Sequence, residues 1–159
     1  MTIDELTVAD WPAVSRIFEE GLDQGTFEET VPSWEQFDER YITAPRLVAR
    51  GGDGVLGWAA LALVSRRPCY RGVAENSVYV GAEARGGGVG RALLEELVRR
   101  ADEAGIWTVQ AHMFADNAPS RALHEACGFR LVGIRDRLAR KHGVWRDTAL
   151  LERRSPSID

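Results

Sequence analysis

A carboxylate and two imidazoles are the side chains of this sequence best suited to proton transfer. Glu75 comes two residues before the alternating run Ser77-Val78-Tyr79-Val80, so a strand carries it on the same face as the first and third residues of that run. His142 falls in a polar turn near the end of the sequence, and His124 lies in a short helical pattern. Glutamate and histidine both serve as general acids and bases. From the residues alone, a solvated or purely structural role for each stays open.

A glycine-rich segment follows the strand that carries Glu75. Arg85-Gly86-Gly87-Gly88-Val89-Gly90 leads into a helical run that begins at Arg91. Glycines let the backbone approach a ligand closely, and the first amides of a helix present N–H donors to an anion. The segment lacks the Gly-Lys-Ser/Thr of a nucleoside triphosphate loop, and it departs from the dinucleotide fingerprint. It therefore predicts a pyrophosphate cradle, with a tight turn that binds no ligand as the alternative.

Composition narrows the class of partner. The 159 residues have a formal net charge of -4 and no long basic stripe, which argues against nucleic acid and favours a small molecule. No run reaches the length of a membrane span and the first residues do not resemble a leader, so we expect a cytoplasmic protein without membrane contact. Cys69 and Cys127 have no metal-ligand spacing around them, so we expect neither a disulfide framework nor a metal.

The elements that must position these residues form one α/β unit. We expect a single domain over residues 1–154 and a loose tail over residues 155–159. Apolar positions at helical spacing and capping residues predict helices from about 10 to 22, 33 to 44, 91 to 105 and 117 to 127. Apolar and β-branched runs predict strands at 3–6, 47–49, 55–64, 77–81, 106–113, 129–138 and 144–151. Residues 51–54 predict a hairpin turn between two of these strands.

Two motifs occur in an order and at spacings that resemble the GNAT superfamily of N-acetyltransferases. Arg85-x-x-Gly88-x-Gly90 resembles the acetyl-CoA loop of that superfamily. Asn117-x-x-Ser120-x-x-Leu123-His124-x-x-x-Gly128-Phe129 resembles the helix that borders the pantetheine arm. The resemblance covers nearly the whole chain. It implies an α/β fold with a mixed, mostly antiparallel sheet of about seven strands, flanked by about four helices.

Four further segments are similar to the phosphinothricin and methionine sulfoximine N-acetyltransferases. They are Thr26-Phe27-Glu28, Tyr70-Arg71, Glu75-x-Ser77-Val78-Tyr79-Val80 and Lys141-His142-Gly143-x-Trp145-x-Asp147. This second resemblance implies transfer of an acetyl group from acetyl-CoA to the primary amine of an amino-acid-like small molecule. It also implies a homodimer.

The resemblance assigns roles to individual residues. Glu75 would act as the general base and His142 as a second catalytic group, while Phe27, Arg71 and Glu75 would contact the acceptor. A backbone N–H near Tyr79 or Val80 would polarise the thioester. The residues implied to bind acetyl-CoA are Tyr79, Val80, Arg85, Gly86, Gly87, Gly88, Val89, Gly90, Arg91, Asn117, Ser120 and His124.

The chain also departs from the phosphinothricin-type pattern. Ile17-Phe18-Glu19 stands where those enzymes commonly have Ile-Tyr-Asn, and Gly72-Val73-Ala74 precedes Glu75 where a threonine is common. His124 occupies a position where many GNAT enzymes have a tyrosine that protonates the thiolate. Two other functions therefore stay open: a protein or peptide N-acetyltransferase, and an acyl-CoA-binding module without catalysis.

Overall fold

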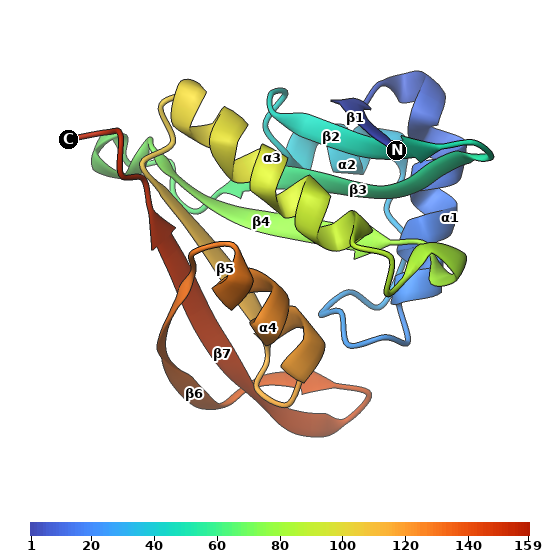
Figure 1. The fold of residues 1–159 in the computed structure, drawn as a ribbon. Coiled ribbons are helices and arrows are strands. Elements are labelled where there is room, and N and C mark those ends of the chain that lie inside the picture. Colours follow the sequence, from blue (N-terminus) through green and yellow to red (C-terminus); the bar gives the residue numbers. More distant parts are fainter.

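A mixed sheet of seven strands forms the centre of the molecule. The computed structural model describes residues 1–159, and the strands follow the order β1-β2-β3-β4-β5-β7-β6 across the sheet (Figure 1). The strands are β1 (Thr2–Glu5), β2 (Arg46–Gly51), β3 (Gly54–Leu63), β4 (Val73–Val80), β5 (Thr108–Phe114), β6 (Arg130–Lys141) and β7 (Val144–Arg154). The helices are α1 (Trp11–Gly21), α2 (Trp34–Arg40), α3 (Val89–Glu103) and α4 (Ala118–Ala126). The α/β architecture expected from the sequence is confirmed.

Strands β4 and β5 run parallel and then separate. Every other pair of neighbouring strands is antiparallel, and the β4–β5 pairing ends where Glu75 lies opposite Gln110. Strand β4 nevertheless continues to Val80 and β5 to Phe114. Figure 1 shows the two strands diverging, with α3 and α4 beside the gap. The second half of β4 therefore has a strand partner on one side only, and Glu75 marks the point of separation.

Two apolar clusters hold the helices on opposite faces of the sheet. Alternate residues of β3 separate into the two clusters: Ala59 and Leu61 belong to one, and Trp58 and Ala60 to the other. Helix α3 packs into the larger cluster through fully buried leucines, whereas α1 and α2 pack into the smaller one through aromatic and branched side chains. Complete burial of one leucine contributes about 1.5–3 kcal/mol, so these clusters hold α1 and α3 against the sheet.

The structure corrects several element boundaries. Helix α2 ends at Arg40 rather than near residue 44, because the Arg46 guanidinium binds the carbonyl oxygens of Asp38 and Ile42 and the carboxylate of Asp38, which closes the helix end. Strand β4 begins at Val73 rather than Ser77, since residues 73–75 pair with β5. Helix α3 begins at residue 89, two residues earlier than expected, so the last two residues of the glycine-rich segment belong to the helix. Glu75 therefore lies within β4, on the same face as Ser77 and Tyr79, as the alternation predicts.

The two-residue turn between β2 and β3 agrees with the hairpin expected at residues 51–54. At the C-terminal end, the backbone N–H of Ser155 donates to the carbonyl of Trp107, and Arg154 donates to the carbonyl of Ile158. These contacts attach residues 155–159, for which the sequence predicts a loose tail, to the end of the sheet. None of the helices combines the length and the apolar character that crossing a bilayer requires.

Candidate active site

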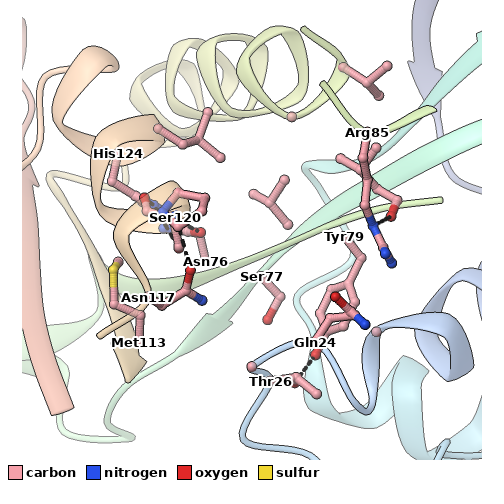
Figure 2. Close-up of a pocket in the computed structure, with 18 of the residues that line it drawn as sticks. Gln24, Thr26, Asn76, Ser77, Tyr79, Arg85, Met113, Asn117, Ser120 and His124 are labelled. Atoms are coloured by element: carbon pink, nitrogen blue, oxygen red, sulfur yellow. Dashed lines mark hydrogen bonds between the residues drawn. The ribbon is translucent and has the colours of Figure 1, made fainter. Parts of the chain in front are cut away.

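A cavity of about 600 Å³ opens where β4 and β5 separate. Its walls come from the loop after α1, the second half of β4, the glycine-rich segment with the start of α3, and helix α4. Figure 2 shows Ser77 and Tyr79 of β4 between the two sides, with Thr26 on one side and His124 on the other. Segments that are far apart in the sequence therefore meet around one space.

The glycine-rich segment has the backbone conformation of an anion cradle. Gly86 and Gly88 have φ angles of 78° and 82°, in the left-handed region that favours glycine, and Gly88 is the N-cap of α3. Helix α3 is 15 residues long, and the first amides of such a helix have no intrahelical acceptor. These donors lie at the edge of the cavity and fit the pyrophosphate of acetyl-CoA. Gly87 does not line the cavity.

The cavity has opposite charges at its two ends. Arg85 and Arg91 lie at the end formed by the glycine-rich segment, and Arg85 donates to the carbonyl oxygen of Val80 at 3.2 Å. Glu75 lies at the other end, at the start of the gap between β4 and β5. An anionic group and a cationic group can therefore bind in one cavity without competing for the same charges.

Tyr79 lines the cavity, and its partly buried side chain packs against the smaller apolar cluster. The ring stacks on Trp58 and Phe18, with centroids 4.7 and 4.9 Å away, and the hydroxyl hydrogen-bonds to Thr26. Burial of the phenol holds the pKa of Tyr79 well above its ordinary value. The side chain is therefore suited to hold the loop after α1 against β4, and unsuited to donate a proton.

Glu75 is held by two side chains of β5. His112 Nδ1 lies 2.6 Å from Glu75 Oε1, and Gln110 Nε2 donates to the same oxygen at 3.2 Å. Burial raises the pKa of Glu75, but the hydrogen bonds from His112 and Gln110 outweigh burial, so the pKa lies below its ordinary value. The side chain remains 38% exposed, so an ionised carboxylate is accessible from the cavity.

Sequence reasoning missed both partners of Glu75. Gln110 and His112 alternate along a strand that was expected at residues 106–113, and their types alone gave no reason to pair them with Glu75. The parallel register places Gln110 opposite Glu75, and His112 follows two residues later on the same face. Only the strand order reveals this contact.

His124 is buried beside the cavity and anchored at both ring nitrogens. Nδ1 lies 2.7 Å from the carbonyl oxygen of Ser120, and Nε2 lies 3.1 Å from the side-chain oxygen of Asn76 (Figure 2). Burial lowers the pKa of His124, although the hydrogen bond to the Ser120 carbonyl acts in the opposite direction. The ring is thus rigid, and it lines the wall on which a pantetheine arm was expected.

The start of α4 explains the positions of Asn117 and Ser120. Asn117 is the N-cap of the helix, and its side-chain oxygen accepts from the backbone N–H of Ser120 at 3.2 Å. Both residues also line the cavity, so the capping role and a contact with a bound cosubstrate are compatible. Figure 2 shows both on the α4 side of the cavity.

The loop after α1 forms the remaining wall and is tied down at several points. Lys141 Nζ donates to the carbonyl oxygens of Leu22 and Thr26, which connects the end of β6 to this loop. Phe27 lines the cavity, is 40% exposed, and packs edge-on against Phe114 of β5. The sequence predicted Phe27 here, but it gave no sign that Lys141 would hold the loop in place.

Two residues expected at the site lie outside the cavity. Arg71 precedes β4 at the end far from Val80, where its guanidinium stacks on Trp107 and donates to the Pro68 carbonyl. His142 has a φ angle of 50° and is exposed in the turn between β6 and β7. Because β4 extends back to Val73, Arg71 is farther from the cavity than the sequence suggested. In this structure neither side chain contacts the space beside Glu75.

Comparison with known proteins identifies the family. The sequence profile of the Acetyltransferase (GNAT) family matches residues 6–129. Phosphinothricin N-acetyltransferase of Alcaligenes faecalis is 36% identical over 153 residues, which are 91% of this chain and 77% of that protein. The L-methionine sulfoximine/L-methionine sulfone acetyltransferase of Pseudomonas aeruginosa is 32% identical over 161 residues, covering 95% of this chain and 92% of that protein.

A solved structure agrees with the sequence relatives. The crystal structure of a GNAT superfamily phosphinothricin acetyltransferase from Sinorhizobium meliloti, in complex with acetyl-CoA, superposes with a TM-score of 0.86. Its sequence is 33% identical, and the alignment covers 99% of this chain and 94% of that chain. The anion cradle at the start of α3 and the cavity beside it have the form that acetyl-CoA requires. The chain belongs to the Acetyltransferase (GNAT) family and is an acetyl-CoA-dependent N-acetyltransferase.

Proposed function

We propose that this enzyme transfers the acetyl group of acetyl-CoA to the primary amine of an amino-acid-like small molecule, by direct attack of the amine on the thioester. The observation that carries the proposal is the anchored, ionised carboxylate of Glu75 in the same cavity as the anion cradle of α3. That arrangement lets one cavity bind an anionic cosubstrate at one end and a cationic acceptor at the other.

The chain's own residues supply the binding of the cosubstrate. Acetyl-CoA contributes the activated acetyl thioester. The amides at the start of α3 hold its pyrophosphate, with Arg85 and Arg91 adding positive charge. Asn117, Ser120 and His124 form the wall for the pantetheine arm. The backbone of Tyr79 and Val80, which lacks a partner strand on the β5 side, provides an N–H that polarises the thioester carbonyl.

Glu75 acts as the general base. An ammonium group cannot attack a carbonyl carbon, so one of its protons must leave first. The carboxylate takes that proton directly or through one water molecule, and the lowered pKa of Glu75 keeps it ionised at neutral pH. Both ring nitrogens of His124 are engaged, by the Ser120 carbonyl and the Asn76 side chain, so His124 serves as part of the wall and not as the acid for the departing thiolate.

We infer that the acceptor is a small molecule and not a peptide. The loop after α1 lines the cavity and is fastened by Lys141, by the contact of Thr26 with Tyr79, and by an ion pair of Glu28 with Arg40 at 2.8 Å. Phe27 adds an apolar wall. The relatives named for phosphinothricin and methionine sulfoximine support an amino acid analogue as the acceptor class.

Acetyl-CoA-dependent release of free CoA thiol tests the proposal. The panel contains phosphinothricin, methionine sulfoximine, methionine sulfone, the common amino acids and a lysine peptide. We expect saturable release with one or more of the amino acid analogues and none with the peptide. Preferential release with the peptide would instead support the protein N-acetyltransferase.

The variant Glu75→Gln separates an enzyme from a binding module. We expect its kcat to fall by about 100-fold or more while acetyl-CoA binding, measured by calorimetry, stays within a few-fold of the unchanged protein. The amide keeps the size of the side chain but cannot accept the proton. Unchanged turnover in this variant would show that Glu75 is not the base.

We further propose that residues 1–154 act as one domain and that the protein forms a homodimer. The apolar residues Val132 and Ile134 of β6 are 44% and 50% exposed, and Val144 and Trp145 at the start of β7 are exposed as well. Exposed apolar side chains on this hairpin favour association, so we propose that a second copy of the chain packs against it.

A further inference from the structure

The Glu75 carboxylate is bound through one oxygen only. Oε1 accepts from His112 Nδ1 at 2.6 Å and from Gln110 Nε2 at 3.2 Å, whereas Oε2 has no hydrogen-bond partner in the protein. Both donors come from β5, at the last residue pair that it shares with β4 and two residues beyond it. The strand pair therefore fixes the carboxylate just where the two strands separate.

The imidazole of His112 can only donate a hydrogen bond to the Glu75 carboxylate. An ionised carboxylate only accepts hydrogen bonds, so the proton must lie on Nδ1 of His112. Its Nε2 is buried and has no hydrogen-bond partner in the protein, so no acceptor stabilises the tautomer with the proton on Nε2. The side chain of His112 is 20% exposed, which leaves little freedom for the ring to turn away from Glu75.

We propose that Gln110 and His112 are positioning residues for Glu75, which hold Oε1 and leave Oε2 as the oxygen that accepts the proton of the acceptor. This inference deepens the proposed function and rests on it. In the step, one N–H bond of the ammonium breaks and an O–H bond forms on Oε2. The electron pair stays on nitrogen, which then attacks the thioester carbon. A C–N bond forms, the C–S bond breaks, and CoA leaves as the thiolate.

Among the side chains around Glu75, His112 makes the largest contribution to lowering its pKa. On β3, the neighbour of Glu75 is Ala62, which carries no charge. On β5, Gln110 is neutral and His112 is the titratable group in contact. The other charged or titratable groups that line the cavity are Glu28, Tyr79, Arg85, Arg91 and His124. Glu75 forms no ion pair with any of these five.

Loss of the His112 hydrogen bond has a defined effect on ionisation. Burial alone would raise the pKa of Glu75, and the hydrogen bonds from β5 reverse that effect. Without His112, the pKa rises toward or above its ordinary value. The carboxylate is then protonated over a wider acid range, and the acid limb of kcat/KM moves to higher pH.

Two substitutions of His112 distinguish between two roles for this residue: positioning the Glu75 carboxylate, and transferring a proton through the imidazole itself. His112→Asn keeps a short N–H donor near the position of Nδ1 but has no basic nitrogen, whereas His112→Leu removes both. We expect His112→Leu to lose kcat/KM by about tenfold at neutral pH and more at acidic pH. His112→Asn should stay within about threefold with the acid limb near its original pH. Equal losses in the two variants would assign proton transfer to His112 and overturn the proposal.

A direct titration of Glu75 makes the test independent of turnover. Carboxyl ¹³C shifts of labelled glutamate are followed against pH, and the Glu75 signal is assigned by its absence in Glu75→Gln. We expect the pKa to rise in His112→Leu and to remain low in His112→Asn; an unchanged pKa in His112→Leu would overturn the proposal. If no amine is acetylated but the titration behaves as expected, the proposed function fails and the anchoring of Glu75 stands.

Thr148→Val is the matched control. Thr148 lies on β7, is 2% exposed, and lines a small side cavity together with His112, but it makes no contact with Glu75. Its hydroxyl is buried without a hydrogen-bond partner, so valine replaces it at the same size. We expect both the Glu75 titration and kcat/KM to stay within about twofold. A shift as large as that of His112→Leu would point to general disturbance of packing and overturn the specific role.

Discussion

At the scale of single residues, one end of the cavity depends on backbone conformation and the other on a charged side chain. Gly88 works through its backbone: a left-handed φ of 82° turns the chain so that the amides of α3 face the cavity. Glu75 works through its side chain, whose charge depends on hydrogen bonds from the next strand. The turn at Gly88 can be predicted from the residue type, because glycine adopts this conformation without strain. The charge of Glu75 depends on side chains that are 35 and 37 positions farther along the chain.

Gly88→Ala tests the backbone contribution. A Cβ at this position would meet no atom within 4 Å, so the expected cost is conformational: about 1–2 kcal/mol of unfolding free energy for a left-handed φ. Because the cradle then relaxes, we also expect the KM for acetyl-CoA to rise. Urea unfolding and steady-state kinetics measure the two effects. Gly87→Ala is the control, since Gly87 has no positive φ and does not line the cavity. Equal losses in both variants would contradict the role of Gly88.

At the scale of elements, the site depends on how β4 separates from β5 and how the loop after α1 closes over the gap. The parallel pairing stops at Glu75, and the space that follows is bordered by α3 and α4. On the opposite side, Lys141 at the end of β6 reaches back to two carbonyl oxygens of the loop. The last hairpin of the chain thus supports the wall that we assign to the acceptor.

Lys141→Met tests that support. The substitution keeps the apolar stem of the side chain but removes both hydrogen bonds to the loop, so the wall carrying Phe27 loses its anchor. We expect the KM for the acceptor to rise by about tenfold, with little change in the KM for acetyl-CoA. Arg140→Met is the control, because Arg140 is exposed and stacks on Trp145 instead. An unchanged acceptor KM in Lys141→Met would mean that the loop keeps its position without the lysine.

At the scale of the whole molecule, the sheet is covered unevenly. The β1–β4 half has helices on both faces, whereas β6 and the start of β7 expose apolar side chains such as Val132, Ile134 and Trp145. In Figure 1 the β6–β7 hairpin extends beyond the helices. This is the surface that we propose for association of two copies.

Ile134→Glu tests the dimer. We expect the unchanged protein to have twice the mass of one chain in light scattering, and Ile134→Glu to have the mass of one, since a charge on the covered face opposes association. Val8→Glu is the control, because Val8 is 61% exposed in the short turn before α1. A single-chain mass for the unchanged protein, or a dimer that survives Ile134→Glu, would reject this interface.

Local patterns in the sequence predicted much of the fold and one part of the site. Alternation identified the strand of Glu75, helical spacing identified α1 and α3, and the capping residue Asn117 identified the start of α4. The boundary errors arose where a distant residue decides the end of an element, as Arg46 does for α2. Alternation, helical spacing and capping residues are all patterns of residues close together in the sequence, so they can be recognised without knowing the strand order.

The sequence by itself determined the glycine-rich cradle, the mixed α/β architecture and Glu75 as the candidate base, because short-range spacing and backbone freedom specify each of them. Only the tertiary structure decided that Gln110 and His112 hold Glu75, that Lys141 fastens the loop after α1, and that Arg71 and His142 lie outside the cavity. The physical reason is the register between strands. A side chain's type fixes what it can bind, but the pairing of distant strands determines which partner it reaches.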